Sequence, residues 1–299
     1  MAVSLTLHNA VGAVRGELDG GPARPALSGA GPNAYPLEGP AGGDLVANGR
    51  RIERAVLAFV ALGVLLRVAR YLTNYPVWGD EASLALSFPR RGYLDLLLPL
   101  EYGQICPILF LWAELTAVKL FGFSELSLRL FPLICGVGSI FLFRHVAGRV
   151  LKGPPLLMAV AIFAVSIHPI RHSAEVKPYA TDLLVALGLL ALAIEWYYSP
   201  ERSRWLWLLV GFTPVGLASS YPGVLVAGGI GLVLAPSVWN TRRRGPMIAF
   251  SAYLLMIAAT FAVLFVGVTH RQQAGAVMGL QKYWADSFPP LDSPVRLAS

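Results

Sequence analysis

Charged side chains are scarce in this 299-residue chain, and their scarcity excludes an ordinary soluble domain. Asp, Glu, Lys and Arg together make up 14% of the residues, whereas hydrophobic residues make up 56%. Soluble domains carry about 25% charged residues, so a soluble core of this composition would lack the polar side chains to cover its surface. The remaining charges cluster between long apolar runs, as in membrane proteins. We therefore expect an all-α, multi-pass integral membrane helix bundle.

Several functional signatures are also missing. The chain has no Walker-type phosphate loop, no glycine fingerprint of a dinucleotide-binding strand and helix, and no Asp-x-Asp pair for a metal-bound nucleotide sugar. Its two cysteines, Cys106 and Cys135, provide neither metal-ligand spacing nor a disulfide framework. We expect no cofactor and no metal site, although the sequence leaves the use of a divalent metal open. The net charge of +7 does not call for nucleic acid as a partner, because most Lys and Arg flank apolar runs, where anionic membrane lipids attract them.

Three zones divide the chain. Residues 1–50 are rich in Gly, Pro and Ala without an apolar run of membrane length, so we expect a disordered cytoplasmic tail. Residues 51–270 hold the repeated apolar runs of the predicted membrane bundle, and 271–299 form a predicted extracytoplasmic segment. Seven runs approach the roughly 20 residues that cross about 30 Å of hydrocarbon. They are 53–72, 128–146, 154–170, 179–198, 204–220, 221–239 and 246–268.

The distribution of basic residues predicts the orientation and the role of an eighth run, 105–121. Arg50, Arg51 and Arg54 place the N-terminal side in the cytoplasm by the positive-inside rule. Three later loops, near residues 150, 203 and 243, are also basic. If 105–121 does not cross the membrane, these loops lie in the cytoplasm as well, whereas if it crosses, all three lie outside. We therefore expect 105–121 to be an amphipathic helix on the outer face, where its Glu114 and Lys119 avoid the hydrocarbon. The membrane in question is expected to be the plasma (inner) membrane.

The loop after the first predicted span contains adjacent carboxylates, Asp80 and Glu81, preceded by Gly79. A glycosyl transfer needs a base to accept the proton of the acceptor hydroxyl, and a carboxylate can do this. Asp80 is the candidate base, with Glu81 orienting or assisting it. On local sequence alone the alternative is equally open, that Asp80 caps a short helix starting at Ala82.

The second outward loop, 168–182, packs two cations, two histidines and two carboxylates between apolar runs. Arg171 and Lys177, together with the helix start after Pro178, would suit a lipid phosphate. Asp182 lies one turn into that helix on the face of Tyr179. The alternative is that the cations reach lipid headgroups while Asp182 complements the helix dipole.

Three motifs in order carry a family resemblance: Trp78-Gly79-Asp80-Glu81-Ala82, then the segment 122–130, then Ala174-Glu175-Val176-Lys177-Pro178-Tyr179. Over about 50–240 the chain resembles GT-C-type membrane glycosyltransferases, nearest to family 39, the protein O-mannosyltransferase and aminoarabinose-transferase-like proteins. The resemblance implies a polyprenyl-phosphate sugar as donor. We expect a glycan, lipid or protein as acceptor, and the predicted topology places the site on the outer face. The resemblance also implies Asp80 as base, Glu81 as its neighbour, and Glu175, Lys177 and Tyr179 as site residues.

The chain also departs from that family. Lys177 stands where many relatives have Arg, which puts bidentate phosphate binding there in doubt. The family usually continues with more helices, so we expect a C-terminally truncated member. Two rival classes remain open: a secondary transporter, which should show internal repeats and broken helices near the midplane, and a non-catalytic membrane scaffold.

Overall fold

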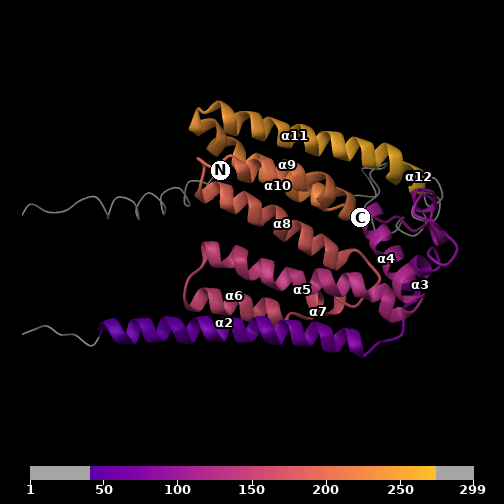
Figure 1. Cartoon of the computed structure of the whole chain (residues 1–299), viewed down its shortest axis with the longest axis horizontal. Coiled ribbons are helices and arrows are strands. Elements are labelled where there is room, and N and C mark those ends of the chain that lie inside the picture. The colour runs from indigo at the N-terminus through magenta and orange to yellow at the C-terminus, as the bar shows by residue number, and fades with distance from the viewer. Residues whose placement is uncertain (1–40, 274–299) are drawn as a thin grey trace, which may run out of the picture. The chain divides into compact units, whose positions relative to one another are not determined.

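A computed structural model describes residues 41–273, and all regular structure in this range is helical (Figure 1). The range contains no β-strand, in agreement with the expected all-α class. The chain divides into two compact units, 1–44 and 45–299, and apart from the first residues of one helix everything described below belongs to the second. Helix α2 begins at Ala41, ahead of the start expected near residue 50. The predicted tail before it and nearly all of the predicted segment 271–299 lie outside the described residues.

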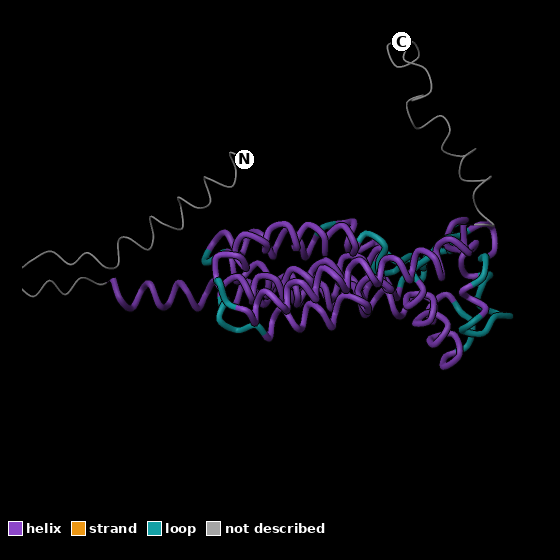
Figure 2. The backbone as a smooth tube through the Cα atoms, turned by 90° about the horizontal axis from the view of Figure 1, so that it is seen from above, coloured by secondary structure: helices purple, strands orange, loops and turns teal. Residues whose placement is uncertain are grey.

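The helices of the bundle run side by side, and consecutive helices of the bundle alternate in direction along the chain when the two shorter ones, α6 (Pro154–Val165) and α9 (Arg204–Ser219), are included (Figures 1 and 2). Within residues 41–273, five helical stretches are long and apolar enough to cross a membrane. They are α2 (Ala41–Leu72, spanning from Gly49), α5 (Glu125–Val150), α8 (Tyr179–Tyr198), α10 (Gly223–Thr241) and the continuous helical stretch Arg244–Gln273. That stretch contains α11 (Arg244–Leu264), a π-helical turn (Phe265–Thr269) and α12 (His270–Gln273).

Two of the seven expected spans are helices too short for a straight crossing of about 30 Å, although 204–220 is only one residue shorter than predicted. Helix α6 (Pro154–Val165) has 12 residues and α9 (Arg204–Ser219) has 16, so at about 1.5 Å per residue they reach only about 18 and 24 Å. The run 154–170 is interrupted at Ser166, and α7 (Ile167–His172) follows as a separate helix. Pro169 explains the break, because its ring clashes with the carbonyl four residues earlier, that of Val165, and it has no N–H to donate.

The short helices gather at one end of the long ones (Figure 1). They are α3 (Gly79–Ala85), the 3-10 turns η1 (Asp95–Leu97) and η2 (Glu101–Gly103), α4 (Ile108–Phe121) and α12. With 14 residues, α4 reaches about 21 Å and is too short to cross a bilayer. Its Lys119 is exposed, as a polar face requires, but its Glu114 is fully buried. The carboxylate of Glu114 has no hydrogen-bond partner among the described residues, and burial raises its pKa well above the ordinary value.

The opposite ends of the helices are joined by ion pairs. The Arg149 guanidinium at the end of α5 binds both carboxylate oxygens of Glu195 near the end of α8, and Arg144 pairs with Glu53 of α2. Since the helices alternate in direction, the basic loops near residues 150, 203 and 243 lie at this end, away from α3 and α4 (Figure 1).

Small residues allow the helices to approach closely. A Cβ atom placed on Gly63 of α2 would lie 3.0 Å from the Cβ of Ala164 in α6. Close contact of this kind is the main source of attraction between helices in lipid, because lipid tails are as apolar as the side chains. The same contact lets Arg67, fully buried in α2, donate to the carbonyls of Gly63 and Ala164 at 3.0 and 3.3 Å.

Candidate functional site

The first loop leads into α3, and Glu81 rather than Asp80 caps that helix. Trp78 has extended backbone at the N-cap position, and its N–H donates to Oε2 of Glu81, 3.3 Å away. This is one half of a capping box, in which the third residue of the helix reaches back to the cap. Helix α3 begins at Gly79, not at Ala82. Asp80 lies in the first turn with its side chain 55% exposed, so the capping role considered for Asp80 belongs to Glu81.

Glu81 also connects the two loops. Its side chain is only 2% exposed, and Oε1 accepts the backbone N–H of Val176 at 2.7 Å. Oε2 lies 3.4 Å from the guanidinium of Arg129, which is itself buried and donates to the carbonyl of Tyr75 at 2.6 Å. With its oxygens occupied in this way, Glu81 orients the loops and is not placed to meet a substrate.

Asp80 faces the second loop from the exposed side. Its Oδ2 lies 3.5 Å from Nζ of Lys177, which also donates to Oε1 of Gln104 at 3.0 Å. The Lys177 side chain is 11% exposed, so the ammonium group is held between a carboxylate and an amide. The structure thus brings together two residues that lie 97 positions apart in the sequence and that were both predicted as site residues.

Glu175 is the centre of a second group of charges. Its buried carboxylate accepts hydrogen bonds from Nε of Arg171 and, at 2.6 Å, from Nδ1 of His172. Burial by itself would raise the pKa of Glu175, but the hydrogen bonds from His172 and Arg171 outweigh it and hold the pKa below the ordinary value. The Arg171 side chain remains 53% exposed, so its guanidinium is open to an anion as well as bound to Glu175.

A cavity of about 220 Å³ adjoins these groups. It lies between α5, α7 and the start of α8 and is lined by Gly136, His168, Pro169, His172, Tyr179, Ala180 and Leu183. The ring centroids of His172 and Tyr179 are 4.7 Å apart, and 45% of Tyr179 is exposed. Among the predicted site residues, Tyr179 lines this cavity.

Asp182 turns away from this group. It lies one turn into α8 and faces the hydroxyl of Ser220, in the turn between α9 and α10. Its Oδ1 is buried without a hydrogen-bond partner among the described residues. Asp182 is thus close to the site in sequence but belongs to the adjoining interior of the bundle.

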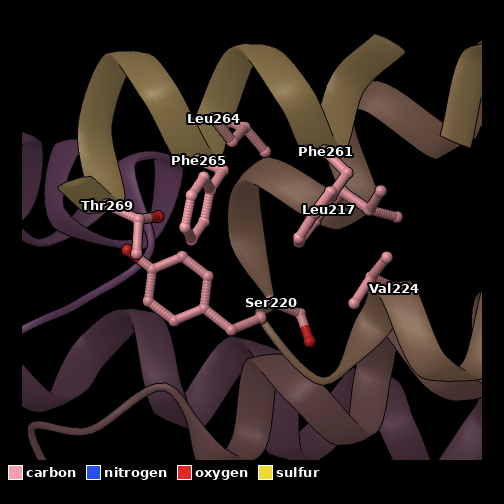
Figure 3. Close-up of a pocket in the computed structure, with 8 residues that line it drawn as sticks. Leu217, Ser220, Val224, Phe261, Leu264, Phe265 and Thr269 are labelled. Carbon is pink, nitrogen blue, oxygen red and sulfur yellow. The ribbon is translucent and has the colours of Figure 1, made fainter. Parts of the chain in front are cut away.

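Ser220 also lines a second cavity, of about 170 Å³ (Figure 3). Apolar side chains from α9, α10, α11 and the π-helical turn form its walls, and hydroxyl-bearing side chains lie toward one end. The full lining is Leu217, Ser220, Tyr221, Val224, Phe261, Leu264, Phe265 and Thr269.

Two polar residues that fix this end of the bundle are not apparent from the sequence. Oε1 of Gln272 in α12 accepts the N–H of Cys106 at 3.0 Å, and its Nε2 donates to the carbonyl of Leu96 at 3.2 Å. The hydroxyl of Tyr221 donates to the Cys106 carbonyl at 3.0 Å, and burial raises the pKa of Tyr221 to about 12, which keeps it protonated. Nothing in the sequence near Gln272 points to this contact, because its partners lie more than 160 positions away.

Arg129 is a third supporting residue that the sequence reasoning missed, although a feature of the sequence could have indicated it. It is a cation at the start of the predicted span 128–146, and a charge within an apolar run is expensive unless it has a partner. Its partner is Glu81.

Within residues 41–273, no three or more His, Cys, Asp or Glu side chains are grouped so that they could hold a metal ion. Comparison of the chain with protein-family models, with curated proteins and with solved structures finds no match.

Proposed function

We propose that the chain is a membrane glycosyltransferase that moves a sugar from a polyprenyl-phosphate donor to an acceptor hydroxyl. The observation that carries the proposal is the pairing of Asp80 with Lys177. An exposed carboxylate, suited to accept a proton, lies beside a cation suited to a phosphate, at the end of the bundle where α3 and α4 gather. Arg171 adds a second, half-exposed cation in the same loop as Lys177.

The chemistry follows from these positions. Asp80 accepts the proton of the acceptor hydroxyl as the oxygen attacks the sugar carbon, and the bond from that carbon to the donor phosphate breaks. The phosphate leaves as an anion, and Lys177 and Arg171 stabilise its charge. Because acceptor and leaving group occupy opposite sides of the reacting carbon, a base and a cation that are close but distinct suit the reaction. Glu81 serves as the positioning residue and does not touch the substrate.

The donor's apolar chain requires a separate binding surface. The cavity in Figure 3 has apolar walls. It lies where α9 ends and α10 begins, at the same end of the bundle as α3, which carries Asp80 (Figure 1), and we assign the prenyl chain to it. Ser220 lines this cavity and faces Asp182. We therefore assign Asp182 the role of holding the cavity next to the site.

The proposed topology has seven crossings, with α6 and α7 together forming one of them and the short α9 another. The N-terminal side and the three basic loops lie in the cytoplasm, and Asp80 and Glu175 face outward from the plasma (inner) membrane. The short helices and the site would then lie at the outer interface, where a lipid-linked donor presents its headgroup.

The test is transfer of label from radiolabelled polyprenyl-phosphate sugars in membranes that contain the chain. Asp80→Asn should lower the transfer rate about 100- to 10,000-fold, as loss of a general base does, while donor binding changes by less than about threefold. Asp95→Asn is the matched control, because Asp95 lies in the same loop region and accepts the N–H of Gly92 at 2.8 Å. Absence of any transfer by the unaltered chain favours the non-catalytic scaffold, and near-normal transfer by Asp80→Asn removes Asp80 from the reaction.

A further inference from the structure

His172 is held as an oriented imidazole. Its Nδ1 is bound by the buried carboxylate of Glu175 at 2.6 Å, so in the neutral ring the proton lies on Nδ1 and Nε2 is left as an acceptor. The second oxygen of Glu175 is bound by Arg171, which prevents the carboxylate from turning away. Such a carboxylate fixes the tautomer and the plane of the ring and raises the basicity of its free nitrogen, as it does for metal-binding histidines.

The surroundings of His172 are also rigid. Gly136 of α5 touches Ser173 so closely that a Cβ atom at Gly136 would lie 2.4 Å from the Ser173 Cβ. Ser173 is fully buried and its hydroxyl donates to the carbonyl of Ile170 at 2.7 Å. The end of α7, which carries His172, therefore packs directly against α5 beside the cavity.

The chemistry of the cavity differs from that of a phosphate site. Its lining contains no Lys or Arg, since Arg171 pairs with Glu175 and Lys177 with Asp80. It offers instead the adjacent ring faces of His172 and Tyr179, with the second imidazole of His168 at 6.1 Å from His172. Aromatic faces carry partial negative charge and attract the C–H face of a ring, while the polar ends of these side chains bind hydroxyl groups.

The size of the cavity agrees with a single ring. A cavity of about 150 Å³ in another protein accommodates benzene, so about 220 Å³ leaves room for a six-membered ring with substituents. The walls are otherwise small or apolar, as in most small-molecule sites, where a few polar groups set the orientation.

From these observations we infer that the cavity between α5, α7 and α8 is the subsite for the sugar of the donor, with Nε2 of His172 as hydrogen-bond partner of a sugar hydroxyl. Glu175 acts as a positioning residue through His172, and Arg171, at the mouth, is left for the phosphate. This inference rests on the proposed function, because it assumes a sugar linked to a lipid phosphate.

The experiment compares two ligands that differ only in the sugar. Purified chain in detergent is titrated calorimetrically with a short-chain prenyl-phosphate sugar, tested as the mannose, glucose and arabinose forms, and with the same prenyl phosphate lacking the sugar. His172→Ala should weaken binding of the best sugar-bearing lipid at least tenfold and change binding of the bare prenyl phosphate by less than about twofold. Lys177→Ala should weaken both. His145→Ala is the matched control, since that histidine contacts Glu195 at the opposite end of the bundle.

Two further measurements separate a local effect from misfolding. His172→Gln is a milder variant that retains a polar side chain. Before titration, each variant is checked for a single monodisperse species with unaltered helicity. In Glu175→Gln, nitrogen-15 NMR of the histidine rings should show a smaller share of His172 with the proton on Nδ1. An unchanged tautomer ratio would show that Glu175 does not orient the ring.

The outcomes are distinguishable. If the chain binds both lipids and His172→Ala affects neither, or affects both equally, the sugar subsite is wrong while the proposed function stands. If the unaltered chain binds no prenyl-phosphate compound, the proposed function fails and the subsite fails with it.

Discussion

The link between the two loops through Glu81 can be tested most directly by removing its carboxylate. In Glu81→Ala the N–H of Val176 loses a charged acceptor at 2.7 Å, the N–H of Trp78 loses its cap, and the buried guanidinium of Arg129 loses its counter-ion. A buried hydrogen bond to a charged group contributes about 1.5–3 kcal/mol, and breaking a buried ion pair costs about 3–5 kcal/mol. We expect the free energy of local opening of the second loop to fall by about 3 kcal/mol, near the lower end of the ion-pair range.

Amide hydrogen exchange followed by mass spectrometry measures this effect. A loss of about 3 kcal/mol corresponds to roughly 150-fold faster exchange at Val176 when exchange reports the opening equilibrium. Glu81→Gln should give an intermediate effect, because its amide keeps one acceptor oxygen but presents N–H groups to Arg129. Glu101→Ala is the matched control, since Glu101 pairs with Arg91 at 2.9 Å while its side chain is 50% exposed, and exposed pairs contribute only about 0–1 kcal/mol. Equal exchange at Val176 in Glu81→Ala and Glu101→Ala, within about a factor of two, would show that the carboxylate does not hold the second loop.

Three other predictions concern packing, burial and orientation. Gly136→Ala should lower the free energy of unfolding by about 1–3 kcal/mol through overpacking, whereas Gly148→Ala in the same helix, where a Cβ meets nothing within 4 Å, should leave it unchanged or raise it; thermal unfolding in detergent compares the two, and equal destabilisation would contradict the close contact. The free energy of unfolding of the unaltered chain should fall relative to that of Glu114→Gln as pH rises from 5 to 8, by at most about 1.4 kcal/mol per pH unit. The sign follows because burial raises the pKa of Glu114, so the folded chain must keep a proton that the unfolded chain releases; a difference that is flat with pH would show that Glu114 is ionised in the fold. For orientation, Arg90→Cys should react with an impermeant maleimide from outside and Arg243→Cys only from the cytoplasm, against a low background because Cys106 and Cys135 are buried; labelling of both from one side would refute the proposed topology.

The sequence alone determined the all-α class of the protein and the ends of some of its helices. Apolar runs separated by short basic segments predicted an all-α membrane bundle. The observed ends of α8 coincide with the predicted span 179–198. These features are local, because length, hydropathy and Pro or Gly positions act within a few residues. The count of seven spans was less secure for the same reason. A hydropathy window does not register that Pro169 interrupts the run after α6, and the run that forms α9 is only 16 residues long.

Only the tertiary structure decided what each polar residue does. Asp80 and Glu81 are adjacent carboxylates in the sequence, yet one is exposed beside Lys177 and the other is buried against Val176 and Arg129. The difference arises because successive residues of α3 point in different directions, and the direction of the core is set by segments about 50 and 95 positions away. Asp182 was grouped with Tyr179 by helical spacing, but the neighbouring helices place Ser220 against it. Contacts of this kind depend on which helices pack together, and that choice is made by the shapes of many side chains at once.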